Sequence, residues 1–228
     1  MSPAIIESPS VAAHTPPTTR TPVGVYLFVG LTVVIALGAV LLQPWLPASD
    51  LLRDSQDVAA RHGSSHAAYG LISNVGILMM AVASGAALVG WIVLGGRTSA
   101  LRSLLAWSAV LGLAFVLDDL LLLHETAAFL PGASIAIAAV YGLAFFRYLW
   151  RFRSTIRREL DAGLLAAAVV ALAVSALVDV VIDPTEWSVF IEDGAKLLGV
   201  VAWSVFVVRA TLVALTRVRP HRRVVALN

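Results

Sequence analysis

Residues 117–125 read Leu-Asp-Asp-Leu-Leu-Leu-Leu-His-Glu and lie near the end of a long apolar run. A helix that crosses a membrane needs about 20 mainly apolar residues, and this run is long enough. It nevertheless carries four ionisable side chains, those of Asp118, Asp119, His124 and Glu125. A later apolar run adds Glu192, Asp193 and Lys196. Ionisable groups inside a membrane are costly and mark functional sites, so these two stretches predict both the fold class and the site.

The composition is that of a polytopic membrane protein. Of the 228 residues, 59% are hydrophobic and only 13% are charged, and the mean hydropathy is +0.89. A soluble domain of this length does not need so much apolar surface. The absence of cysteine excludes disulfides, thiolate metal sites and cysteine nucleophiles. Arginine far outnumbers the single lysine, as is typical of a GC-rich genome, so we expect a protein of a bacterial inner (plasma) membrane.

Six apolar runs are long enough to span a membrane as helices. They cover residues 23–42, 68–94, 101–130, 132–150, 162–182 and 187–215. The predicted fold is therefore all-α, with six transmembrane helices in a domain that covers residues 23–215. The first run is too long for the core of a signal peptide and lacks a small-residue cleavage site after it, so we expect it to be retained.

The segments outside the spans have their own composition. Residues 1–22 are rich in Pro, Ser, Thr and Ala, which predicts a disordered tail, and residues 216–228 form a basic tail. Residues 46–67 make the one long external loop. Within it, residues 50–61 predict a single short helix that begins at Ser49 or Asp50.

The positions of the arginines predict that both termini are cytoplasmic. Arginines lie in both tails and in the second and fourth loops, whereas the third and fifth loops have none. We expect Arg147 and Arg209, which lie inside spans, to extend to the cytoplasmic face. The basic character of the chain is thus explained by membrane anchoring, and we expect no nucleic-acid partner.

Polar groups from four spans converge at one depth, roughly a third of the way in from the outer face by helical rise. They are Ser73 and Asn74 in the second span, the acids of residues 117–125 in the third, Asp179 in the fifth, and Glu192, Asp193 and Lys196 in the sixth. Helical phase places Asp118 and Glu125 on one face of the third span, with Asp119 and His124 on opposite flanks. We expect no similar cluster of charges in the inner half.

Charge balance limits what this cluster can be. It contains six carboxylates, those of Asp118, Asp119, Glu125, Asp179, Glu192 and Asp193, against one lysine and at most one protonated histidine. Six anions cannot share a pocket of low dielectric without compensation. Either several are protonated or cations are bound.

A bound metal ion is the first of these answers. Histidine and carboxylates without cysteine suit Zn, Mn or Fe. The predicted ligands are Asp118, Glu125 and Glu192, with Asp119, His124, Asp179 and Asp193 beside them. Metal-activated water predicts hydrolysis of a lipid or small amphiphile taken from the membrane. Asp118 or Glu192 would serve as general base, and Lys196 would balance charge or bind an anionic headgroup.

Two other functions are open on the sequence. Carboxylates and a single lysine at one depth also suit a proton- or cation-coupled transporter or channel. A membrane scaffold that uses an acidic outer cavity for binding is the other. Bound metal would favour the hydrolase, and a polar path that reaches the cytoplasm would favour the transporter.

Overall fold

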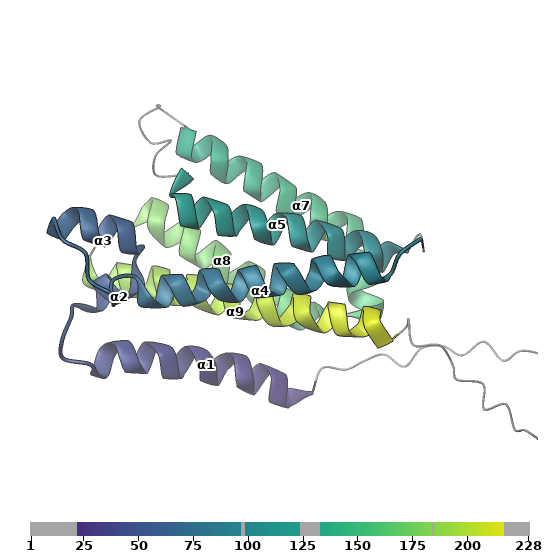
Figure 1. The fold of residues 1–228 in the computed structure, drawn as a ribbon, viewed down its shortest axis with the longest axis horizontal. Coiled ribbons are helices and arrows are strands. Elements are labelled where there is room, and N and C mark those ends of the chain that lie inside the picture. The colour runs from purple at the N-terminus through teal and green to yellow at the C-terminus, as the bar shows by residue number, and fades with distance from the viewer. Residues whose placement is uncertain (1–21, 97–98, 124–132, 184, 217–228) are drawn as a thin grey trace, which may run out of the picture.

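The computed structural model describes residues 22–96, 99–123, 133–183 and 185–216. This part of the chain forms helices and contains no strand. The long helices are α1 (Val23–Leu42), α4 (Leu71–Val93), α5 (Ala100–Leu121), α7 (Ala133–Glu159), α8 (Ala162–Val181) and α9 (Glu186–Thr216). Two short helices, α2 (Ala48–Leu52) and α3 (Ser55–His62), lie together at one end of the bundle, and the start of α1 and the end of α9 lie at the other (Figure 1).

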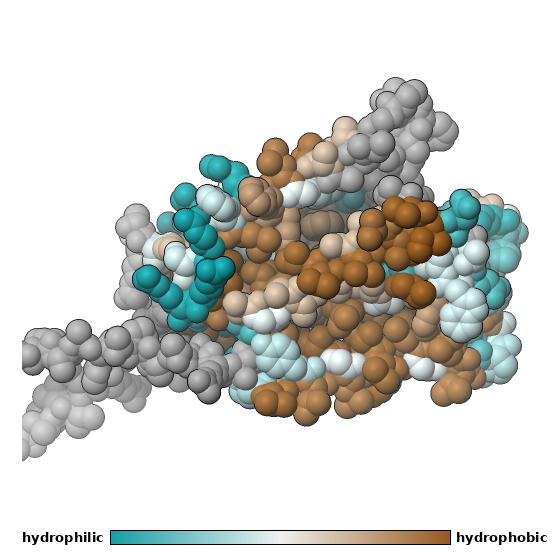
Figure 2. Space-filling model, turned by 180° about the vertical axis from the view of Figure 1, so that it is seen from behind, coloured by the Kyte–Doolittle hydropathy of each residue, from teal (hydrophilic) through white to brown (hydrophobic). Residues whose placement is uncertain are grey.

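Five of the long helices are long and apolar enough to cross a membrane: α1, α4, α5, α8 and α9. Figure 2 shows a hydrophobic band across the middle of the molecule with hydrophilic residues gathered at its two ends. The predicted all-α fold is confirmed, and it has the character of a multi-pass membrane protein. The helix α7, where the fourth span is predicted, is not among the five, and its second half carries five arginines. Six spans and cytoplasmic termini stay predictions.

The helix α9 lies at the centre of the bundle and packs against α1, α4, α5 and α8. Its inward face is fully buried at Val201, Ala202 and Val207. A glycine lets α8 come close, because a Cβ at Gly199 would lie 2.6 Å from Cγ of Leu172. Since α9 touches so many elements, polar groups near its start can be reached from several helices.

The third predicted span is too long. It was expected to cover residues 101–130, whereas α5 ends at Leu121 and Leu122 adopts a left-handed conformation with φ 48°. The helical-phase argument that placed Glu125 above Asp118 therefore does not apply. His124 and Glu125 lie outside the described residues, as do nearly all of the two predicted tails.

The predicted single helix over residues 50–61 is wrong, because two helices form instead. The chain is extended at Arg53 and Asp54, and the residues before α2 and α3 are Pro47 and Asp54 rather than Ser49 or Asp50. Tertiary contacts explain the break. The Asp50 carboxylate is buried, with Oδ2 2.9 Å from Nε2 of His62, and its carbonyl accepts a hydrogen bond from the Gly70 N–H (2.8 Å).

A glycine fixes this two-helix cap against α4. Gly70 has φ 64°, a conformation that side chains disfavour. Its Cα also approaches the backbone of the turn between α2 and α3, since a Cβ would lie 2.5 Å from the Ser55 nitrogen and 2.8 Å from the Arg53 oxygen. The cap, defined here as residues 48–62, therefore sits in a fixed position over the end of the bundle.

Candidate functional site

A small cavity of about 30 Å³ lies beneath the cap, between α4, α5 and α9. Its polar lining consists of Ser73 from α4, Asp119 from α5, and Asp193 and Lys196 from α9, and the rest of its wall is apolar. A volume of this size accommodates about one water molecule or a small cation. The structure thus brings together three of the predicted site residues, Asp119, Asp193 and Lys196.

The central contact is an ion pair between α5 and α9. The Lys196 Nζ lies 3.2 Å from both Oδ1 and Oδ2 of Asp119. The two side chains are 32% and 19% exposed, so the pair is largely removed from solvent. Breaking one partner of such a pair leaves the other charge uncompensated, which costs more than the pair contributes.

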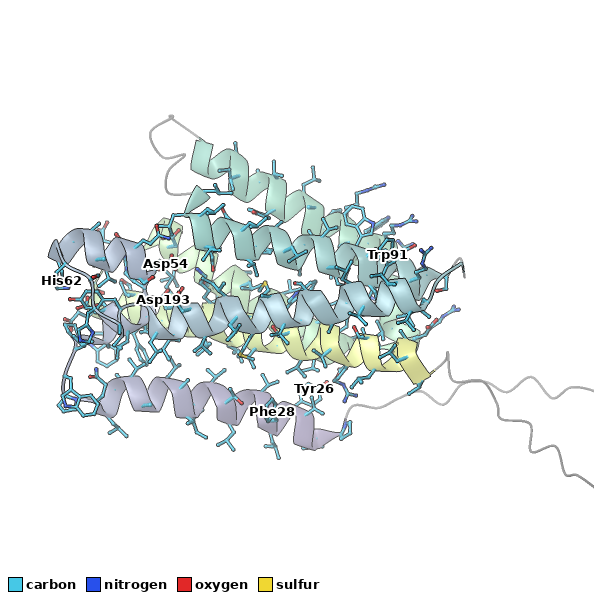
Figure 3. All side chains as sticks on the ribbon, viewed as in Figure 1. Tyr26, Phe28, Asp54, His62, Trp91 and Asp193 are labelled. Carbon is cyan, nitrogen blue, oxygen red and sulfur yellow. The ribbon has the colours of Figure 1, made fainter. Side chains whose placement is uncertain are left out.

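Asp193 lies beside this pair with an oxygen that has no partner. Its Oδ2 is buried and accepts no hydrogen bond from any described residue. The positive charges of Lys196 and Arg53 stabilise the ionised form of Asp193, whereas the negative charges of Asp54 and Asp119 destabilise it. Figure 3 shows Asp193 and Asp54 at this same end of the bundle. A buried carboxylate oxygen without a donor is costly as an anion, which makes Asp193 the group that a proton or cation would satisfy.

The cap contributes residues that the sequence placed in an external loop. Ser73 donates a hydrogen bond to Oδ1 of Asp54 (2.6 Å), which ties α4 to the start of α3. The amide of Gln56 donates to the Leu120 carbonyl (2.9 Å), next to Asp119. Sequence reasoning missed Arg53 and Asp54 as parts of the site. The mixture of arginines and aspartates in residues 50–61 was the only available signal, and it is equally typical of a solvated helix face.

The remaining predicted residues lie around the cavity or away from it. Glu192 is half-buried and lies near Asp193, Asp179 and Arg53, while Asp179 itself is exposed. Asp118 is buried, but it does not line the cavity and its charge acts on Tyr141 of α7. The acid of α5 that meets α9 is therefore Asp119.

The metal prediction gains no support from the geometry. Within the described ranges, no group of three or more histidines and carboxylates is arranged so that it could hold a metal ion. The position between Asp119 and Asp193 is shared with the ammonium group of Lys196, which already supplies positive charge. Because His124 and Glu125 lie outside the described residues, the Zn, Mn or Fe site stays a prediction.

A second charged cluster lies near the opposite end of the bundle, where the sequence predicted none. Asp161 caps α8 by accepting the Leu164 N–H (3.2 Å), and it also accepts the Tyr26 hydroxyl (2.7 Å). The Arg209 Nε lies 4.0 Å from Asp161 Oδ2 and is buried. Arg209 thus lies next to the buried Asp161 carboxylate, and its expected extension to the cytoplasmic face stays a prediction. This cluster ties α1, α8 and α9 together.

Comparison with known proteins gives a family but no characterised relative. No curated protein and no solved structure matches the chain. Residues 25–210 match a family described as a domain of unknown function, DUF8692, and this match covers α1 to α9 almost completely. The chain belongs to that family.

Proposed function

We propose that the protein is a proton-coupled membrane transporter or channel, and that Asp193 is its proton-binding group. The observation that carries the proposal is the arrangement of Lys196 beside two carboxylates. One of them, Asp119, holds the ammonium at 3.2 Å, while the other, Asp193, has a buried oxygen with no donor among the described residues. Ionisable groups in this kind of position serve as proton relays and ion sites in membrane proteins.

Charge balance explains why a proton suits this site. Asp54, Asp119 and Asp193 meet near Lys196 and Arg53, so a gain of one positive charge improves the balance. When Asp193 is protonated, Lys196 pairs with Asp119 alone. When Asp193 loses its proton, the same ammonium can be shared between the two carboxylates. The single lysine therefore couples the protonation of Asp193 to the contact between α5 and α9.

Buried hydroxyl groups continue beyond the cavity. Ser204 and Thr211 share the face of α9 that carries Asp193, since eleven and eighteen residues correspond to about 20° and 0° of helical rotation. Both are buried, and the Ser204 Oγ has no hydrogen-bond partner among the described residues. Ser84 of α4 and Ser108 of α5 are also buried. These hydroxyls supply polar groups in the half of the bundle away from the cap.

The other functions expected from the sequence have less support. Metal-dependent hydrolysis of a lipid or small amphiphile needs a ligand set, and none occurs in the part of the chain that is described. A scaffold function does not explain an unpartnered carboxylate oxygen inside the bundle. A location in a bacterial inner membrane, with the cap outside, fits the arginine distribution and belongs to the proposal.

Proton flux through proteoliposomes tests this function. Vesicles that contain a pH-sensitive dye and purified protein receive a potassium diffusion potential, and the rate of internal pH change is measured. We expect Asp193→Asn to lower the rate by about tenfold or more, equivalent to about 1.4 kcal/mol in the barrier. The matched control is Asp183→Asn, which removes an exposed acid at the same end of the bundle and should leave the rate unchanged.

Two results of the flux assay would contradict the proposal. Wild-type flux no greater than that of empty vesicles, or an Asp193→Asn rate equal to that of wild type, would exclude Asp193 as the coupling group. Melting temperatures of both variants separate loss of flux from loss of fold. Infrared difference spectra between acid and neutral pH give an independent check, since the part of the protonated-carboxyl carbonyl band that comes from Asp193 should be missing from Asp193→Asn.

A further inference from the structure

The second half of α7 forms a groove that the proposed function does not use. The groove has a volume of about 330 Å³ and is lined by Arg147, Trp150, Arg151, Arg153 and Ser154. It contains three guanidinium groups and no carboxylate. Within the described residues, none of these arginines forms an ion pair. Three unpaired cations around one groove favour an anionic occupant.

The lining groups lie close together on the exposed side of α7. Arg147, Arg151 and Ser154 follow one another at spacings of four and three, so they share one face of α7. Arg153 is folded back onto the tryptophan, with its guanidinium carbon 4.5 Å from the Trp150 ring centroid and Nη1 donating to the Trp150 carbonyl (3.1 Å). Arginines at i and i+4 repel each other, and an anion between them removes the repulsion.

An apolar stripe leads from this groove toward the middle of the bundle. Val140 and Leu143 are 66% and 68% exposed, and Val140 lies seven residues before Arg147 on the same face of α7. Val140 lies about 10 Å from Arg147 along the helix axis. Trp150, also exposed, lies at the boundary between the apolar and the basic part, as interfacial tryptophans do. The face has cationic side chains at one end and hydrocarbon side chains at the other. It therefore complements a lipid with an anionic headgroup and an acyl chain.

We propose that this face of α7 is a binding site for an anionic membrane phospholipid. The phosphate lies between Arg147 and Arg151, where Ser154 can donate to it. An acyl chain lies along Leu143 and Val140. A free phosphate or nucleotide would use the arginines but would leave the exposed apolar stripe without a partner, and this is why the lipid is the occupant that the whole face fits.

Lipid binding to the detergent-purified full-length protein tests the site. Native mass spectrometry measures apparent dissociation constants for phosphatidylglycerol and phosphatidylcholine with the same acyl chains. We expect wild type to prefer the anionic lipid and Arg147→Gln/Arg151→Gln to lose about tenfold in its affinity. The control is Arg157→Gln/Arg158→Gln, which removes the same charge from the same helix outside the groove and should retain the preference.

Each other outcome overturns the proposal. Equal losses of affinity for phosphatidylglycerol in the two double variants would show that only net charge matters. Equal wild-type affinity for the two lipids would show that the arginines do not distinguish the headgroups. Displacement of phosphatidylglycerol by an equal concentration of inorganic phosphate would show that the acyl stripe contributes nothing. If the glutamine variant does not fold, Arg147→Lys/Arg151→Lys keeps both charges and should lose affinity because lysine lacks the paired donors of a guanidinium.

Discussion

Replacing Gly70 by alanine should release the cap from the end of the bundle. Gly70 has φ 64°, and an L-residue in this left-handed region costs about 1–2 kcal/mol. The new Cβ would also lie 2.5 Å from the Ser55 nitrogen, 2.9 Å from the Ser55 Cα and 2.8 Å from the Arg53 oxygen. These are backbone atoms that cannot rotate away. Overpacking of this kind costs about 1–3 kcal/mol more, so we expect a total of about 2–5 kcal/mol.

The matched control is Gly63→Ala. Gly63 has almost the same conformation, φ 63°, but nothing lies within 4 Å of the position of its Cβ. Its variant should therefore lose only the conformational part, about 1–2 kcal/mol. The free energy of unfolding is measured by tryptophan fluorescence in a denaturant titration of the purified protein in detergent micelles. Equal losses in the two variants would refute the close contact between the cap and α4.

Two further changes test the charged clusters. Lys196→Met should destabilise the protein by about 2–4 kcal/mol because it removes the ammonium group that pairs with the largely buried Asp119 carboxylate, and adding Asp119→Asn should restore part of the loss. Independent, additive effects in this double-mutant cycle would contradict the ion pair. Tyr26→Phe should cost about 1–2 kcal/mol through the lost hydrogen bond to the Asp161 carboxylate. Tyr141→Phe, which loses a longer bond to the neutral Ala114 carbonyl (3.2 Å), should cost less in the same titration, and the reverse order would count against the Asp161 contact.

That the site residues lie at one level of the bundle was predictable, whereas the pairing among them was not. Asp119, Asp193 and Lys196 were all expected at one depth, because depth follows from residue number and helical rise. Which acid meets the lysine depends on the rotation of α5 about its axis, and packing against α7 and α9 sets that rotation. The structure therefore selects Asp119 for Lys196, while the charges of both Asp118 and Asp119 act on Tyr141 of α7.

The cap illustrates the same limit at the level of local structure. Residues 50–61 have a helical pattern, so one helix was the reasonable expectation. Two contacts divide this segment into α2 and α3. One is the buried contact of Asp50 with His62, and the other is the close approach of Gly70 to the backbone of the turn between the two helices. These contacts join residues 12 to 20 positions apart, and no local propensity encodes them. Asp54 reaches the site only because of this division.

The sequence by itself determined the membrane character and most helix bounds. The runs predicted at 23–42 and 162–182 correspond to α1 (Val23–Leu42) and α8 (Ala162–Val181), because apolar length is a property of contiguous residues. The tertiary structure alone decided the end of α5, the cap, the Asp119–Lys196 pair and the Asp161 cluster. Each depends on which side chains from separate helices come into contact. Buried charges favour the arrangements in which they are paired, because an unpaired buried charge is strongly destabilising.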